Sequence, residues 1–355
     1  MKKHLIAAAV AGAFAVPAMA QVTVYGLVDV GYQSTETKIS NGNKTEASTF
    51  GANGQQSGSR LGVRGEEDLG GGMKVGFVYE LGVDPTVSTG FADMSNRQAF
   101  VSVSGGFGEV RLGRQYTGVF GVNAAHDAGS TFGGFGYLGT AAHTGWPGNV
   151  RANDVVRYQT RTISGFWLAV AFADDASKTT SNAGVVTTKS EVGGQTITGS
   201  YTAGPLSAMV SWSGAESETV ASSVTTVKAD QTRTNVGASY NLGVLSLHLT
   251  HNQLNTDDKL ATNLDTDYSD TNIGVRVPVG ATTLWASTGE GEQKRKGLSL
   301  ASANIDYSAF QIGASYALSK RTNVYAAIGE TEAKVKSTGV KTTDEGMYFG
   351  IRHSF

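Results

Sequence analysis

The chain ends in MYFGIRHSF, residues 347–355. Met347, Phe349, Ile351 and Phe355 occupy positions of one parity, whereas the positions on the other parity carry tyrosine, glycine, arginine and serine. In a β-strand these two sets of side chains point to opposite faces. An apolar face that continues to the last residue requires either a packed cover or a surrounding solvent other than water. The rest of the sequence has to decide between these two environments.

The N-terminus has the pattern of a cleaved secretory signal. Lys2 and Lys3 provide positive charge, residues 5–16 are apolar, and residues 18–20 read Ala-Met-Ala, the small-x-small pattern of a signal-peptidase site. The apolar run is too short to cross a bilayer, which takes about 20 residues. Residues 1–20 are therefore predicted to be a signal peptide, and the mature chain is predicted to lie outside the cytoplasm.

The composition of the remaining chain excludes several classes of protein. It contains no apolar run of about 20 residues that would form a membrane helix. It also contains no cysteine, so disulfides do not stabilise it. Removing Lys2 and Lys3 changes the formal charge from −2 to −4, because 28 basic residues become 26 against 30 acidic residues. This balance is too mild to indicate a nucleic-acid partner. No linker divides residues 21–355, which are predicted to form one unit.

Short alternating segments are the repeated feature of this unit. Phe166, Leu168, Val170 and Phe172, for example, share one face of a strand. Tight turns alternate with long polar segments rich in Ser, Thr, Asn, Asp and Gly. About 16 strands are predicted on this basis, near residues 22–33, 58–67, 72–83, 95–104, 109–116, 151–160, 165–173, 191–202, 206–215, 232–241, 243–254, 270–278, 281–290, 302–317, 321–331 and 345–355.

The arrangement of strands and loops favours a membrane barrel over a soluble β-sandwich, which would also show alternation. The long loops fall on one side only, and both termini fall on the short-turn side. An even number of antiparallel strands lets the last strand pair with the first, which removes both edges. Only helices and closed barrels satisfy every backbone group in lipid. We therefore predict an all-β fold, a 16-stranded antiparallel transmembrane β-barrel, in which Phe355 faces lipid and closes the barrel.

Tyrosines near the strand ends fit the aromatic girdles that such barrels place at the two membrane interfaces. The predicted girdle residues are Tyr25, Tyr32, Tyr158 and Tyr240.

Four stretches of the sequence resemble the Gram-negative general diffusion porins, and most closely the porins of the β-proteobacterial outer membrane. They are SRLGVRGEEDLGGG (59–72), RQAFVSV (97–103), GEVRLGRQY (108–116) and the closing GIRHSF (350–355). The resemblance implies a homotrimer in the cell outer membrane, in contact with lipid and lipopolysaccharide. It also implies that the third long loop, about 117–150 here, folds inward and narrows the pore.

The composition of this loop fits an inward position independently of the resemblance. It is rich in glycine, and it carries aromatic residues that would pack against the barrel wall, namely Phe120, Phe132, Phe135, Tyr137 and Trp146. A long loop in a compact protein is usually functional. A contact between subunits would explain the aromatic residues equally well.

Charged residues on the predicted inner wall are candidates for setting passage through the pore. By motif position, the resemblance implies that Arg60, Arg97 and Arg151 line the constriction and face Asp127 on the loop. Strand parity independently places Arg60 and Arg64 in the lumen, because a guanidinium in lipid would cost roughly 2–4 kcal/mol at the midplane. Secondary lumen charges are predicted at Arg64, Arg114, Arg157, Lys74, Glu80, Glu66 and Asp29. The alternative is that these arginines only balance carboxylates and hold the wall together.

The balance of charge at the narrowing predicts the selectivity. Asp127 is the single carboxylate between Thr117 and Val150, whereas enterobacterial relatives carry several on this loop. Three arginines against one carboxylate give a positive local field, and charge at the narrowest point decides selectivity. The predicted function is a passive, water-filled diffusion channel for small hydrophilic solutes and ions, with weak preference for anions and no metal or cofactor.

Several alternatives remain beside this interpretation. A solute-specific porin would use a row of lumen aromatics, for which Trp167 and Trp285 are the candidates. A barrel enzyme would need an oriented nucleophile and base, and neither His248 nor His251 has such partners in the sequence. An adhesin would need a filled lumen. The acidic segment 257–270 is a candidate for binding a divalent cation that bridges to lipopolysaccharide. It lacks the glycine and the bidentate Glu of an EF-hand, and the alternative is a solvated surface loop.

Overall fold

The computed structural model describes residues 21–53, 56–87, 95–129, 150–180, 186–221, 224–259, 265–296 and 304–355. The predicted signal peptide lies outside these residues. The strands are β1 (Gln21–Ile39), β2 (Lys44–Asn53), β3 (Arg60–Gly70), β4 (Met73–Gly82), β5 (Ser95–Gly105), β6 (Gly108–Tyr116), β7 (Arg151–Gln159), β8 (Phe166–Thr180), β9 (Val186–Ala203), β10 (Leu206–Ala221), β11 (Val224–Asn241), β12 (Ser246–Asp258), β13 (Asp265–Val279), β14 (Thr282–Lys296), β15 (Ile305–Ala317), β16 (Thr322–Val335) and β17 (Lys341–Ser354). The helix α2 (Gly118–His126) follows β6.

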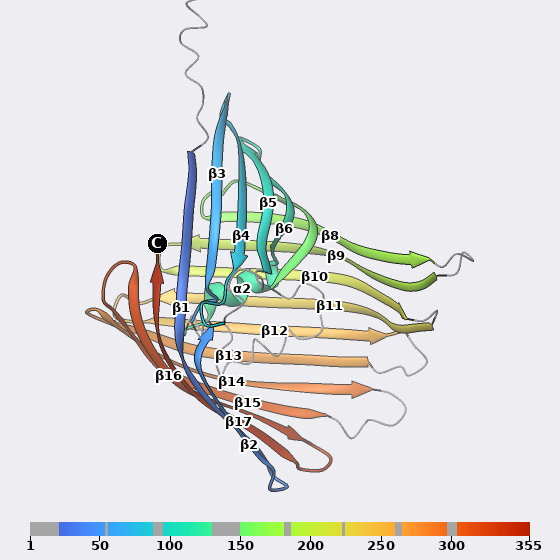
Figure 1. The fold of residues 1–355 in the computed structure, drawn as a ribbon, viewed down its shortest axis with the longest axis vertical. Coiled ribbons are helices and arrows are strands. Elements are labelled where there is room, and N and C mark those ends of the chain that lie inside the picture. Colours follow the sequence, from blue (N-terminus) through green and yellow to red (C-terminus); the bar gives the residue numbers. More distant parts are fainter. Residues whose placement is uncertain are drawn as a thin grey trace, which may run out of the picture.

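The strands form a closed antiparallel barrel (Figure 1). β1 pairs with β17, and two backbone hydrogen bonds of 3.1 Å between Gly26 and Phe355 extend this pairing to the last residue. β2 and β3 both pair with β1, so the two segments share one position in the wall. The barrel therefore has 16 strand positions, as the sequence predicted. Closure removes the exposed strand edges that a membrane would not tolerate.

The two faces of the wall differ in polarity as the alternation requires. Apolar side chains such as Phe172 and Ile197 are exposed on the outer face, with 58% and 48% of their surface accessible. Polar side chains such as Asn235, Asn252 and Gln311 are buried on the inner face. An apolar outer band around a polar interior is the pattern of an outer-membrane barrel. The apolar side chains at the end of the chain, Met347, Phe349, Ile351 and Phe355, all lie on the exposed face.

Several predicted loops are strand in the structure. The polar segment 216–231 was expected to be a loop, but β10 continues to Ala221 and β11 begins at Val224. β2 likewise lies within a segment expected to be a loop. The residue types in these segments do not alternate regularly, while their threonines and valines still favour extended backbone.

The prediction that Tyr25 belongs to an interfacial girdle was wrong. Val24 and Val28 are exposed on the outer face of β1, so Tyr25 lies on the opposite, inner face. Its hydroxyl donates to Glu80 Oε2 at 3.1 Å. Tyr25 is therefore a lumen residue. Tyr158 and Tyr240 are exposed on the outer face as predicted.

The helix α2 lies inside the ring of strands (Figure 1) and contacts β9, β10, β11 and β12. Thr117 caps it by accepting a hydrogen bond from Phe120 N. Asn123 Nδ2 donates to Asn252 Oδ1 on the inner wall at 3.0 Å. The first part of the third long loop thus packs against inward-facing side chains. Residues 130–149 of that loop lie outside the described residues, so the inward fold of the whole segment stays a prediction.

Candidate functional site: an arginine cluster on the inner wall

Glu80 on β4 is the centre of the charged site. Its carboxylate is buried and accepts hydrogen bonds from Arg97 Nε at 2.7 Å and from the Tyr25 hydroxyl at 3.1 Å. Arg60 Nη1 lies 4.0 Å from Glu80 Oε1, the oxygen that accepts from Arg97. Side chains from three other strands therefore meet at one carboxylate, which balances their charge and also holds them in place. Charge-assisted hydrogen bonds of this kind fix side-chain geometry more firmly than neutral ones.

A β-bulge turns Arg97 into the lumen. Val101 and Val103 are exposed on the outer face of β5, and simple alternation would put Arg97 on that face as well. The register between β4 and β5 shifts at this point, so that Glu80 pairs with Gln98 and the next β4 residue pairs with Asn96. Arg97 is the extra residue. A bulge re-aims a side chain in this way without interrupting the rest of the sheet.

Tyr116, at the end of β6, joins two of the arginines. Its hydroxyl accepts from Arg97 Nη2 at 2.8 Å and from Arg151 Nη2 at 3.2 Å. The Arg151 guanidinium carbon also lies 4.7 Å from the centre of the Tyr116 ring, within cation–π range. The same ring stacks on Phe120 of α2, with ring centres 4.5 Å apart. The helix is thus coupled to the arginines through one tyrosine.

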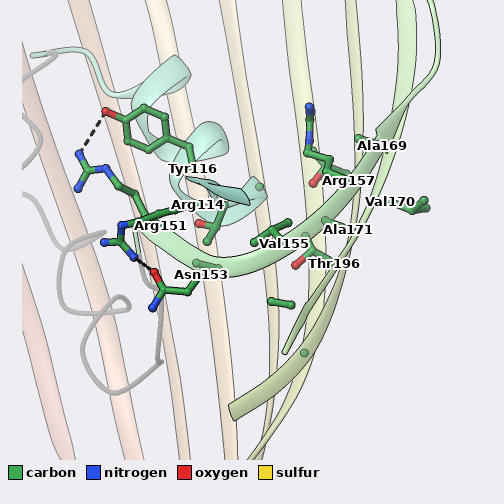
Figure 2. Close-up of a pocket in the computed structure, with 16 residues that line it drawn as sticks. Arg114, Tyr116, Arg151, Asn153, Val155, Arg157, Ala169, Val170, Ala171 and Thr196 are labelled. Carbon is green, nitrogen blue, oxygen red and sulfur yellow. Dashed lines mark hydrogen bonds between the residues drawn. The ribbon is translucent and has the colours of Figure 1, made fainter. Parts of the chain in front are cut away.

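Arg114 and Arg157 lie along the same wall (Figure 2). Arg114 Nη1 donates to Asn153 Oδ1, and its Nε donates to Asn96 O at 2.8 Å. Together with Arg151, they line a pocket of about 90 Å³ in the inner wall. We refer to Arg60, Arg97, Arg114 and Arg151 as the arginine cluster. Among the described residues, Glu80 is the carboxylate in contact with its guanidinium groups, so the cluster has excess positive charge.

Asp127 does not face the arginine cluster, although the motif match had implied that it would. It is buried at the C-terminal end of α2, where its Oδ1 accepts from Gly129 N at 2.9 Å. Its cationic neighbour is Arg276 on β13, whose Nε donates to Ala128 O at 2.8 Å. The physical reason is the direction of α2, which starts beside Tyr116 and carries the residues after it to the other wall. Asp127 and Arg276 therefore anchor the helix end.

The remaining predicted lumen charges have structural partners. The Arg64 guanidinium carbon lies 5.4 Å from the centre of the Tyr25 ring, and Lys74 pairs with Glu66 near the short-turn end. Asp29 is buried and accepts from the backbone of Gln56 and Ser57 and from the Tyr325 hydroxyl. Asp29 therefore ties the chain between β2 and β3 to the wall.

The acidic segment 257–270 is engaged by lysines where it is described. Asp257 contacts Lys259, and Asp267 lies 2.9 Å from Lys296 Nζ. In the described ranges, no three or more His, Asp or Glu side chains are grouped as a metal would require. Part of the segment, 260–264, lies outside those ranges.

The seat of α2 is formed by close contact with the inner wall. A Cβ atom added at Gly237 would lie 2.5 Å from His126 Nδ1 and 3.0 Å from Val122 Cγ1, so only glycine fits beneath the helix there. Ser207 Oγ lies 3.4 Å from His126 Nε2. Burial lowers the pKa of the His126 imidazole.

Sequence reasoning missed several members of the inner wall, among them Tyr116, Arg111 and Arg276. Tyr116 was part of a quoted motif, but its hydroxyl had no assigned role. Leu112 and Ile273 are exposed on the outer face of their strands. Arg111 and Arg276 occupy positions of the opposite parity on the same strands, so parity alone places them on the inner face. The signal that would have found both arginines was thus present in the sequence.

A transmembrane barrel with an apolar exterior, a polar interior and charged groups on the inner wall defines an outer-membrane channel protein. Residues 7–336 match the family model described as Gram-negative porin. The chain belongs to the Gram-negative porin family, as its motifs predicted.

Known proteins similar over the full length agree with this assignment. Outer membrane porin protein 32 of Delftia acidovorans is 33% identical over 380 residues, which is 100% of both chains. An outer membrane porin protein of Bordetella pertussis is 30% identical over 399 residues, again 100% of both. Among solved structures, an anion-selective porin from Comamonas acidovorans is 27% identical with a TM-score of 0.71, covering 95% of this chain and 100% of that one. The protein is therefore a passive diffusion channel of the outer membrane and not an enzyme.

Proposed function

We propose that this porin conducts small hydrophilic solutes with a weak preference for anions, and that Arg60, Arg97 and Arg151 set this preference. The observation that supports the proposal is the imbalance of charge on the inner wall. The arginine cluster has several guanidinium groups, and Glu80 is shared by two of them. A ring of basic side chains at a narrow point favours anions.

Two further features support a positive field at this point. The N-terminus of α2 lies beside Tyr116, and the partial positive charge of a helix N-terminus adds to that of the guanidinium groups. The similar solved structure from Comamonas acidovorans is that of an anion-selective porin. Asp127, which we had expected to reduce the field, has Arg276 on the other wall as its electrostatic partner instead.

Solute flux into vesicles tests this function. Purified protein is reconstituted into liposomes, and the uptake of a neutral, an anionic and a cationic solute of matched size is compared. The proposal predicts uptake of all three, with the anion fastest. Equal uptake would contradict the anion preference, and faster uptake of the cation would contradict the role assigned to the arginine cluster.

We also propose that the channel is a homotrimer in contact with outer-membrane lipid and lipopolysaccharide. An apolar groove of about 670 Å³ on the barrel exterior is lined by Tyr32, Phe349 and Tyr316, with small side chains at Ala314 and Ala326 between them. Small residues between aromatic ones let a second barrel approach closely. Light scattering of the purified protein should give three times the mass of one mature chain, residues 21–355, after correction for detergent. A mass of one chain would contradict the trimer.

A solute-specific porin is not favoured by the described residues. Trp285 and Trp167 do point inward, as parity predicted, but each has a local partner. Trp285 Nε1 donates to Gln311 Oε1 at 3.0 Å, and Trp167 lies beside Arg157 with 6.0 Å between the ring centre and the guanidinium carbon. Two separate rings do not make a continuous aromatic path.

A further inference from the structure

Beyond the arginine cluster, the inner wall has a second basic position. Arg157 lies six residues after Arg151 on β7, at most roughly 20 Å away at about 3.3 Å per residue, because an irregularity at Asp154 shortens the strand. Figure 2 shows Arg157 beside Ala169 and Ala171 of the neighbouring strand β8. The same pocket that Arg151 lines at one end is thus lined by Arg157 at the other.

Arg157 has hydrogen-bonding capacity that the protein does not use. Its Nη2 donates to Gln159 Oε1 at 2.5 Å, while its Nη1 is buried with no hydrogen-bond partner. Gln159 is neutral, so the charge of Arg157 is not balanced by this contact. A buried guanidinium donor without an acceptor is unfavourable, and the Coulomb attraction of an anion in the pocket would offset part of that cost.

Arg111 on the adjacent strand adds to the positive charge. It is directly opposite Arg157 in the pairing of β6 with β7. Arg111 Nη2 lies 2.8 Å from Glu109 Oε2, which balances one of the two charges. Its Nε, like Nη1 of Arg157, is buried without a hydrogen-bond partner. Two guanidinium groups against one carboxylate leave a net positive charge at this position.

The floor of the pocket is apolar and made of small side chains. Val155, Ala169, Ala171 and Ala173 supply it, and Ala169 is 3% exposed. Methyl groups next to guanidinium donors suit a ligand with an anionic head and a short hydrocarbon body. Chloride or phosphate would use the donors but would leave the apolar floor wet.

We propose that this wall pocket is a binding subsite for short-chain monocarboxylates, with the carboxylate on Arg157 and the alkyl chain on the alanine floor. The inference rests on the proposed anion preference, because an anion must enter the lumen to reach it. It adds a second stop on the inner wall, displaced from the arginine cluster toward the short-turn end, and it assigns a ligand class by the chemistry of its walls. A monocarboxylate bound in this pocket would slow the passage of chloride along the same wall.

Inhibition of the chloride current tests the subsite. Acetate and butyrate are added at constant ionic strength to single channels in a planar bilayer, and a dissociation constant is taken from the loss of chloride current. Each buried CH₂ strengthens binding by about fourfold, and butyrate has two more CH₂ groups than acetate, so butyrate should bind up to about sixteenfold more tightly. Equal inhibition by both acids would overturn the apolar floor.

Two variants separate the contribution of the carboxylate contact with Arg157 from that of the alkyl contact with the apolar floor. Arg157→Gln should abolish inhibition by both acids, whereas Ala171→Leu should fill the floor and remove the preference for butyrate while acetate still inhibits. Lys74→Gln, which changes a lumen charge near the short-turn end, is the matched control and should leave both constants unchanged. Unchanged inhibition in Arg157→Gln would overturn the subsite.

The same bilayers distinguish failure of the subsite from failure of the proposed function. The reversal potential in a KCl gradient reports the anion preference without any carboxylate. A channel that prefers anions but is not inhibited by butyrate would overturn the subsite alone. A channel that prefers cations yet is inhibited through Arg157 would support the subsite and contradict the anion preference.

Discussion

Arg97 Nε lies 2.7 Å from Glu80 Oε1, and this pair joins β5 to β4 at the point where the register between them shifts. The bulge brings the arginine to the inner face, and the carboxylate holds its guanidinium there. Arg97 Nη2 then donates a hydrogen bond to the Tyr116 hydroxyl. One acidic residue therefore lowers the net charge of the cluster and at the same time sets its geometry.

Replacement of Arg97 should weaken the preference for anions. Arg97→Gln removes one positive charge from the lumen, and a unit charge about 4 Å away is worth about 1 kcal/mol in water. The ratio of chloride to potassium permeability should fall by up to about fivefold. The reversal potential in a KCl gradient measures this ratio. Lys74→Gln, with its pair to Glu66 near the short-turn end, is the control and should change it little. An equal fall in both variants would mean that position in the lumen does not matter.

Replacement of Glu80 should act in the opposite direction on selectivity. Glu80→Gln keeps the side-chain volume but removes the negative charge, so the preference for anions should increase. The charged hydrogen bonds from Arg97 and Tyr25 would be lost, at a cost of about 1.5–3 kcal/mol in the free energy of unfolding. Urea unfolding of the purified barrel and the reversal potential together test this prediction. A stable variant with weaker anion preference would contradict the role of Glu80.

Removal of the Tyr116 hydroxyl should loosen the cluster without changing its charge. Tyr116→Phe deletes the acceptor for Arg97 and Arg151 but keeps the ring that lies against Arg151. Open-channel current noise should increase, while the channel should keep its sign of selectivity. Tyr158→Phe, which removes a hydroxyl bonded to a turn carbonyl on the outer face, is the matched control. Quiet currents in Tyr116→Phe would show that its hydroxyl does not position the arginines.

Displacement of α2 should change conductance without altering any charge. Gly237→Ala places a methyl group 2.5 Å from His126 Nδ1, so the helix must shift, at a cost of about 1–3 kcal/mol for overpacking. Single-channel conductance should differ from that of the unmodified channel. Gly193→Ala is the control, because the nearest atom to its added methyl is 4.0 Å away. Identical conductance in Gly237→Ala would mean that α2 does not narrow the path.

Alternation predicted the barrel because lipid and water select opposite residue types on the two faces of every membrane strand. Alternation did not predict the strand ends, where this selection of residue types no longer applies. Residues 216–221 and 224–231 do not show a regular alternation of apolar and polar residue types, and the backbone pairs regardless. Alternation also misplaces Arg97, because a bulge changes parity and has no mark in the residue types. The motif RQAFVSV (97–103) indicated an inward Arg97, whereas the two-residue alternation of the strand did not.

Positions on the loop were harder to predict than positions on strands. Asp127 was assigned to the arginine cluster by its place on the loop, but the direction of α2 carries it to Arg276. That direction depends on contacts such as Asn123 with Asn252, which are 129 residues apart. Tyr25 was misassigned for a simpler reason: its phenol suits a membrane interface as well as a lumen, and only its parity with Asp29 separates the two.

The reversal potential of the unmodified channel under a KCl gradient in a planar bilayer is the most direct measurement of the central claim. The arginine cluster predicts stepwise conductance that reverses toward the chloride potential. In a channel with Arg60, Arg97 and Arg151 all replaced by Gln, the reversal should move to zero or beyond it. Reversal of the unmodified channel toward the potassium potential would contradict the claim that these arginines set the selectivity.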